Sequence, residues 1–329
     1  MGRAGGARGA RRRRPALIGP ASLPTATPAR STARGTGFLR GRQGLVVWLC
    51  LLPGLVAYLL FSIVPAVGTL GISLTNFSGV PGLPVVFTGI ENYVQILGDS
   101  YSGVFASLWT TLMFCAGVTV VQNVGGLALA TLLRNRFPGV GLFRAVVFMP
   151  VVLGVTIIGL LWLLMFNPSG GPAASMVALW HSSSAFFGSN TWALPLVVFV
   201  QIWTNLGFTT VVYMAAMDTV PRELYESAAL DGAGRWRMFS AVTFRLIASA
   251  VTVNVLLAVV GSLNTYDTIY VLTGGAANTM TLGMLMFSTA FESSSDLGLG
   301  AAISMLMFAL TLAIALPLQA WLRRREVAA

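Results

Sequence analysis

The stretch from residue 145 to residue 166 reads AVVFMPVVLGVTIIGLLWLLMF and contains no charged side chain. A helix that crosses a lipid bilayer needs about 20 mainly apolar residues, and this stretch supplies them. Comparable stretches occur at 45–66, 104–133, 192–217, 246–265 and 299–322. The sequence therefore predicts an all-α integral membrane protein with six transmembrane helices. A further apolar run, 282–291, is too short to span, and we expect a re-entrant or surface element there.

The composition agrees with a membrane protein and excludes several chemistries. Of 329 residues, 56% are hydrophobic and 9% are charged, whereas soluble domains carry about 25% charged residues. All 20 basic residues are arginine, so the lysine that a nucleotide-binding P-loop requires is missing. The single histidine, His181, excludes a metal site built on paired histidines. We expect no catalytic residue, no metal and no cofactor.

The arginines fall into alternate segments between the predicted spans. Ten precede the first span, three lie between the second and third, four lie between the fourth and fifth, and three follow the sixth. The intervening loops contain none, namely 67–103, 167–191 and 266–298. Because arginine accumulates in cytoplasmic loops, both chain termini are expected in the cytoplasm.

Residues 1–42 account for the whole formal net charge of +10, since they carry ten arginines and no acid. With few large apolar residues they cannot build a core, so we expect a disordered cytoplasmic tail. Adhesion of this tail to anionic lipid is the alternative reading. The transmembrane domain is then 43–325, and 326–329 form a second cytoplasmic tail. The positive net charge indicates the orientation of the chain in the membrane. No nucleic acid partner is expected.

The loop 218–245 reads DTVPRELYESAALDGAGRWRMFSAVTFR and is not a plain connector. Pro221 suits the first turn of a helix, and good helix formers follow it. Asp231 and Gly232 end that helix, because glycine tolerates the left-handed conformation of a helix C-cap. A second short helix is predicted over 234–244. The sequence indicates two cytoplasmic helices with a glycine corner between them.

This loop has the side chains of a docking surface. Three acids can accept hydrogen bonds from a basic partner, and three small residues allow a close approach. The acids are Glu223, Glu226 and Asp231, and the small residues are Ser227, Ala228 and Ala233. An amphipathic loop without a partner is the alternative.

The stretch Glu226–Ala233 resembles the EAA motif of binding-protein-dependent ABC importer permeases. That motif is E-A-A, three residues, glycine, nine residues and I-x-L-P. Glu226, Ala228 and Gly232 stand at the matching positions, and Ser227 replaces the first alanine. Arg245 stands where the family has proline, which puts the turn into the fifth span in doubt.

Three shorter matches occur in the family's order, at 89–93, 143–150 and 266–275. Together with the EAA-like stretch they extend the resemblance over about 45–325, and they are similar to the carbohydrate subfamily of maltose and glycerol-phosphate permeases. The resemblance implies the fold of a type I ABC importer permease. In that family the EAA loop forms a coupling helix in a groove of the ATPase.

The resemblance also implies a multi-pass protein of the bacterial plasma membrane, its partners and its function. The partners are an ABC ATPase dimer, a second homologous permease subunit in a heterodimer, and an extracytoplasmic solute-binding protein. The implied activity is ATP-driven inward transport of a sugar or sugar derivative by alternating access, with residues 221–236 transmitting closure of the ATPase. A permease of the same type for a non-sugar solute is the alternative. Less favoured are a self-sufficient secondary transporter, for which no internal repeat is evident, and an intramembrane enzyme, for which the spans lack ionisable residues.

Polar side chains inside spans are costly and commonly face a cavity. The candidates for a solute pathway are Gln122, Asn123, Gln201, Asn205, Asn254, Asn264 and Tyr266. Gln201 and Asn205 share one helix face because they are four residues apart. Neutral amides and aromatic rings suit the hydroxyls and apolar faces of a sugar. Hydrogen bonding between neighbouring helices is the alternative for each residue.

Overall fold

The computed structural model describes residues 2, 42–98, 103–134, 137–178, 184–293 and 296–327. The tail predicted over 1–42 therefore lies almost entirely outside the described residues, as does His181. The chain divides into two units, Met1–Tyr58 and Leu59–Ala329. The first contains α1 (Arg42–Tyr58), an apolar helix with Pro53 inside it.

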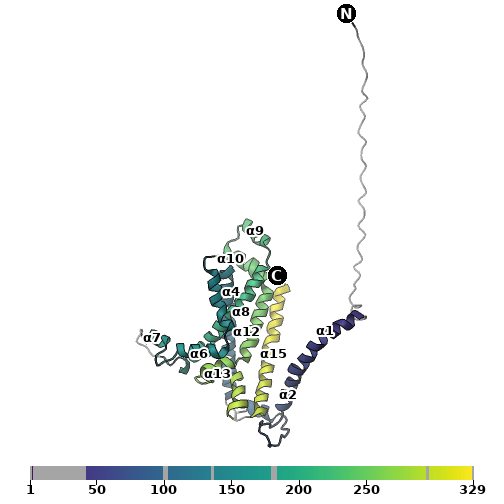
Figure 1. Cartoon of the computed structure of the whole chain (residues 1–329), viewed down its shortest axis with the longest axis vertical. Coiled ribbons are helices and arrows are strands. Elements are labelled where there is room, and N and C mark those ends of the chain that lie inside the picture. Colours follow the sequence, from purple (N-terminus) through teal and green to yellow (C-terminus); the bar gives the residue numbers. More distant parts are fainter. Residues whose placement is uncertain are drawn as a thin grey trace. The chain divides into compact units, whose positions relative to one another are not determined.

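Four long helices of the second unit run side by side as a bundle (Figure 1). They are α4 (Gly103–Arg134), α8 (Ala193–Asp218), α12 (Ala248–Asn264) and α15 (Leu297–Val327). α4 packs against both α8 and α12, and α12 also packs against α15. Small residues allow the closest approaches: a methyl group on Gly126 of α4 would lie 2.6 Å from the Thr209 Cγ2 atom of α8.

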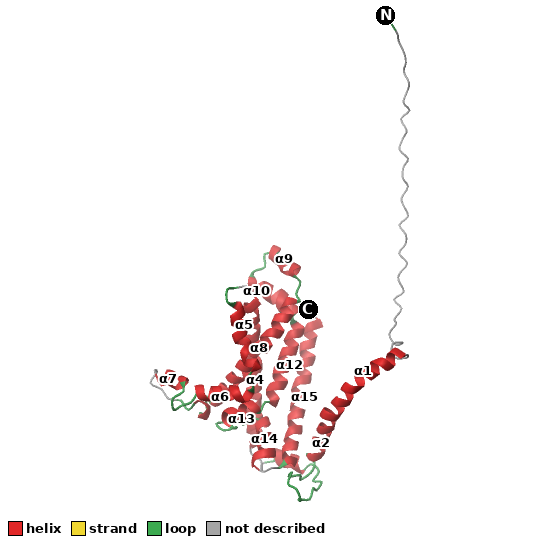
Figure 2. Cartoon of the chain, viewed as in Figure 1, coloured by secondary structure: helices red, strands yellow, loops and turns green. Residues whose placement is uncertain are grey.

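Shorter helices complete the second unit. In chain order they are η1 (Leu59–Ile63), α2 (Val64–Ile72), α3 (Glu91–Leu97), α5 (Val140–Val152), α6 (Val155–Met165), α7 (Pro172–Ala178), η3 (Phe186–Gly188), α9 (Arg222–Leu230), α10 (Arg235–Met238), η4 (Phe239–Thr243), α11 (Phe244–Leu246), α13 (Asp267–Thr273), α14 (Leu282–Phe287) and η5 (Ser288–Ser293). The described residues contain no strand, although one isolated bridge pairs Thr75 with Phe87. Figure 2 shows α9 and α10 at one end of the bundle and α13 and α14 at the other.

Four apolar helical segments are long enough to cross a membrane: Val47–Ile72, Gly103–Arg134, Ala193–Asp218 and Leu297–Arg324. They agree with the predicted spans 45–66, 104–133, 192–217 and 299–322. The predicted third and fifth spans correspond to helix pairs that bend by 109° and 72°. The described helices give up to six spans if each bent pair counts as one, so the number six stays a prediction.

The bend in the predicted third span has a local cause. α5 ends at Val152, and Leu153 and Gly154 are extended, with ψ angles of 140° and 148°. Pro150 lies within α5, and the hydrogen bond that it cannot donate would go to the carbonyl of Val146, before the break and not at it. The run 145–166 is therefore two helices meeting at an extended corner, which its apolar composition does not reveal.

The short run 282–291 does not form a surface element. Its first four residues, Leu282 to Leu285, are buried in α14. α14 packs against α15 and α4, and the Leu282 N–H donates to Thr111 Oγ1 of α4 at 2.9 Å. This segment is an internal part of the bundle at the α13 end.

Candidate functional site

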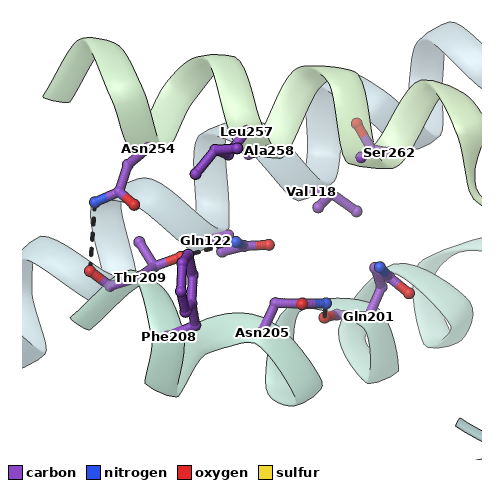
Figure 3. Close-up of a pocket in the computed structure, with 11 residues that line it drawn as sticks. Val118, Gln122, Gln201, Asn205, Phe208, Thr209, Asn254, Leu257, Ala258 and Ser262 are labelled. Carbon is purple, nitrogen blue, oxygen red and sulfur yellow. Dashed lines mark hydrogen bonds between the residues drawn. The ribbon is translucent and has the colours of Figure 1, made fainter. Parts of the chain in front are cut away.

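A cavity of about 190 Å³ lies among α4, α8 and α12. Four of the predicted pathway residues line it together (Figure 3): Gln122, Gln201, Asn205 and Asn254. The remaining lining residues are Val118, Phe208, Thr209, Leu257, Ala258, Gly261 and Ser262. The spacing of Gln201 and Asn205 predicted that they share one face of a helix. In the structure α8 carries both residues, and α4 and α12 supply other parts of the cavity wall.

Hydrogen bonds hold the amides of this cavity in place. Gln122 Nε2 donates to Thr209 Oγ1 at 2.8 Å, and Thr268 Oγ1 donates to Gln201 Oε1 at 2.7 Å. Asn254 Nδ2 donates to the Thr209 carbonyl at 3.4 Å, while its buried Oδ1 has no hydrogen-bond partner among the described residues.

The other three predicted pathway residues do not line the cavity. Asn123 is buried and accepts from the Tyr213 hydroxyl at 2.7 Å, which is the interhelical bonding named as the alternative. Asn264 is exposed and donates to the Val260 carbonyl of its own helix at 2.8 Å. Tyr266 stacks on Phe287, with ring centres 5.1 Å apart. A pathway role for these three stays a prediction.

Thr209 and Phe208 are cavity residues that the sequence reasoning missed. Thr209 is buried and bonds to both Gln122 and Asn254, so it joins the three helices. A threonine inside a helix often bonds the backbone carbonyl four residues before it, so its residue type does not indicate a bond to another helix. Its position one turn after Asn205 on α8 is the only available signal.

The loop 218–245 folds as two helices with a glycine corner. Gly232 has a φ angle of +73°, which is the left-handed conformation predicted for it. The Ala233 N–H donates to the Ala228 carbonyl at 2.9 Å, and the Gly232 N–H donates to the Ala229 carbonyl at 3.0 Å. This pair of bonds is a Schellman motif, which satisfies the last carbonyls of α9. The second helix begins at Arg235 and continues as η4 and α11.

α9 presents its side chains to the surroundings. Its polar candidates Glu223, Glu226 and Ser227 are exposed, and so is Asp231 at its end. The three acids form no ion pair within the described part of the chain. Ala228 and Ala233 are half-buried around the corner. The exposed acids and the small residues beside them are therefore available to a partner.

The arginines of the second unit gather at one of its two ends. Its described arginines lie in or next to the elements of the α9 end: Arg134, Arg144, Arg222, Arg235, Arg237, Arg245, Arg323 and Arg324. The acids Glu91, Asp267, Glu292 and Asp296 lie in or next to elements of the opposite end, and Asp218, Glu223, Glu226 and Asp231 lie at the α9 end with the arginines. The asymmetry has the form that membrane proteins show between their two faces.

The chain matches one protein family and several known transport proteins. The family model described as "binding-protein-dependent transport system inner membrane component" matches residues 122–326, which include the loop and every cavity residue except Val118. The trehalose/maltose transport system permease protein MalF of Thermococcus litoralis is 31% identical over 279 residues, covering 84% of this chain and 93% of that protein. A probable starch degradation products transport system permease protein, AmyD of Thermoanaerobacterium thermosulfurigenes, is 28% identical over 298 residues, covering 87% and 97%.

A solved structure supports the same architecture. A chain of a bacterial alginate ABC transporter, crystallised with an alginate pentasaccharide-bound periplasmic protein, superposes with a TM-score of 0.75 at 19% identity. The match covers 86% of this chain and 96% of that one. Members of the matched family are transport permeases and not enzymes. The chain therefore belongs to the binding-protein-dependent transport system inner membrane components, as a multi-pass permease of an ABC importer.

Proposed function

We propose that this permease carries a neutral sugar or sugar derivative inward through the cavity of Gln122, Gln201, Asn205 and Asn254. The observation that carries the proposal is the lining itself, which offers amides, hydroxyls and one phenyl ring but no ionisable side chain. A charged solute would leave its charge uncompensated in such a site, which is costly. Amide groups can both donate to and accept from sugar hydroxyls.

The names of the relatives support the same class of solute, since one is a trehalose/maltose permease and another serves starch degradation products. The cavity of about 190 Å³ is small beside the 300–1,000 Å³ of complete ligand pockets. We therefore assign it to one half of the pathway, completed by a second, homologous permease subunit in a heterodimer.

We further propose that α9 is the contact with a separate ABC ATPase dimer and that the α9 end is cytoplasmic. The exposed acids of α9 and the arginine-rich surroundings support this placement. An extracytoplasmic binding protein would deliver solute at the α13 end. Closure of the ATPases then moves α9, and the cavity alternates between the two sides of the membrane.

The test of the solute class is uptake into proteoliposomes that contain this chain with its second permease, ATPase and binding protein. We expect ATP-dependent uptake of a labelled neutral di- or oligosaccharide, and competition by unlabelled sugar but not by amino acids. Uptake that responds to an amino acid or an inorganic anion and ignores sugars would overturn the sugar assignment, leaving a permease of the same type for another solute.

A further inference from the structure

One side chain attaches α9 to the bundle more firmly than the others. Every residue of α9 is exposed except Tyr225 and Ala228, which are half-buried, and none is buried. The Tyr225 ring packs against a buried cluster that includes Met217 and Val220 at the end of α8. Tyr225 thus supplies apolar packing between α9 and the bundle.

The Tyr225 hydroxyl lies at a junction of several segments. Arg134 Nη1 donates to Tyr225 Oη at 3.0 Å, and the guanidinium carbon lies 5.2 Å from the centre of the same ring. Tyr225 Oη and Thr243 Oγ1 share a further hydrogen bond of 3.0 Å. Arg134 Nε also lies 3.9 Å from the carboxylate of Asp218. We refer to these four residues as the Tyr225 junction.

The junction connects α9 to the helices that line the cavity. Arg134 is the last residue of α4, Asp218 is the last residue of α8, and Thr243 ends the π-helix that leads through α11 into α12. Side chains of α4, α8 and α12 make up the cavity wall. One tyrosine hydroxyl therefore touches α4 and the approach to α12 directly, and it reaches α8 through Arg134.

We propose that the Tyr225 junction is the joint through which movement of α9 reaches the three cavity-lining helices, so that Tyr225 is a positioning residue for transport. The proposal rests on the proposed function of α9 as the ATPase contact. Hydrogen bonds to a charged donor are short and directional, so they fix orientation as well as distance. The Arg134–Asp218 pair alone is too exposed to hold such a joint.

The test is Tyr225→Phe in the complete complex, which keeps the ring over Arg134 and removes both hydrogen bonds of the hydroxyl. We expect ATP hydrolysis to continue while the solute imported per ATP falls about fivefold or more, the effect of losing one or two hydrogen bonds on an equilibrium. Thr243→Val removes one of these bonds from the other side and is expected to lower the same ratio.

Tyr93→Phe is the matched control, because it deletes a tyrosine hydroxyl that bonds to Ser73 Oγ at 2.7 Å away from α9. It should leave the ratio at the native value. If Tyr225→Phe and Thr243→Val both import as much solute per ATP as the native complex, the proposed role of the Tyr225 junction is wrong. Should Tyr225→Phe fail to assemble, Thr243→Val decides alone.

Glu226→Lys separates this result from a failure of the proposed function, since Glu226 lies on the exposed face of α9 and outside the junction. If Glu226→Lys uncouples transport while both junction variants behave as native, the junction is wrong and α9 keeps its role. If Glu226→Lys also transports normally, the role of α9 itself is wrong.

Discussion

Gly207 marks the tightest contact between α8 and its neighbour α5. A Cβ atom at this position would lie 2.6 Å from the Val147 carbonyl oxygen and 3.1 Å from the Phe148 Cα atom. Both are backbone atoms, so the clash can be relieved only by moving a helix. The sequence shows Gly207 merely as one glycine within an apolar run, because the partner that requires it comes from another helix.

We expect Gly207→Ala to lower the stability of the purified permease by about 1–3 kcal/mol, the cost of overpacking a helix contact. Thermal unfolding in detergent measures the change. Gly68→Ala in α2 is the control, because a Cβ there meets no atom within 4 Å, and alanine then gains helix propensity. Equal melting temperatures for the two variants would contradict the close approach of α5 and α8.

Substitution of Gln201 tests whether the cavity takes part in solute uptake. Gln201→Met keeps the side-chain length but removes the amide and leaves the Thr268 hydroxyl without its acceptor. We expect the concentration for half-maximal solute uptake to rise about fivefold, the effect of one hydrogen bond. Gln95→Met, at an exposed site on α3, is the matched control. Native uptake by Gln201→Met would remove this residue from the pathway.

The sequence predicted which cavity residues share a face of one helix. It did not predict which residues of different helices meet. Gln201 and Asn205 could be paired from their spacing alone. Asn123 and Asn254 look alike in the sequence, yet one bonds to Tyr213 and the other lines the cavity. The difference depends on the rotation of α4 and α12 against α8, which residue types alone do not determine.

Among the elements, the structure of the loop 218–245 agrees best with the prediction from its sequence. Its local signals are strong: proline before the first helix, and glycine where the backbone turns left-handed. Predictions for the apolar helices were less complete. Composition predicted the lengths of α4, α8 and α15, but not the 109° bend between α5 and α6. Proline is tolerated in membrane helices, so Pro150 alone does not predict a break.

Two glycines of this loop provide a test at the element scale. Gly232 has a φ of +73°, whereas Gly234 has a φ of −68°, and a Cβ meets no atom within 4 Å at either. Alanine at 232 strains the backbone by about 1–2 kcal/mol, and alanine at 234 does not. We expect Gly232→Ala to lower the solute imported per ATP and Gly234→Ala to transport normally.

Identical coupling in Gly232→Ala and Gly234→Ala would show that the corner after α9 is not needed in a fixed shape. The stronger change Gly232→Pro removes the N–H that bonds to the Ala229 carbonyl as well. It should uncouple ATP hydrolysis from uptake while the protein still inserts in the membrane. Immunodetection in membrane fractions measures insertion independently of transport.

For the whole molecule, the distribution of arginine predicts which end faces the cytoplasm. The described arginines of the second unit gather at the α9 end, and the acids Glu91, Asp267, Glu292 and Asp296 lie at the other. Charge sidedness is set by insertion and not by packing, which is why it could be read from sequence. The number of spans depends on whether each of the two bent helix pairs crosses the membrane once. Arginine placement does not determine this.

Cysteine labelling tests this orientation. In a variant with Cys50 and Cys115 replaced by serine, Leu230→Cys at the end of α9 should react with a membrane-impermeant maleimide only in inverted vesicles. Leu83→Cys, in the loop before α3, should react only in intact spheroplasts. Both positions are exposed. Labelling in the opposite pattern would place α9 outside and refute contact with a cytoplasmic ATPase.

We propose that this chain is one transport subunit whose energy comes from another polypeptide. The most direct test of this proposal is solute accumulation in proteoliposomes, with the purified chain alone compared with the complex of both permeases, ATPase and binding protein. We predict no ATP hydrolysis and no uptake against a gradient by the chain alone, and ATP-dependent accumulation by the complex. Concentrative uptake by the chain alone would contradict the account.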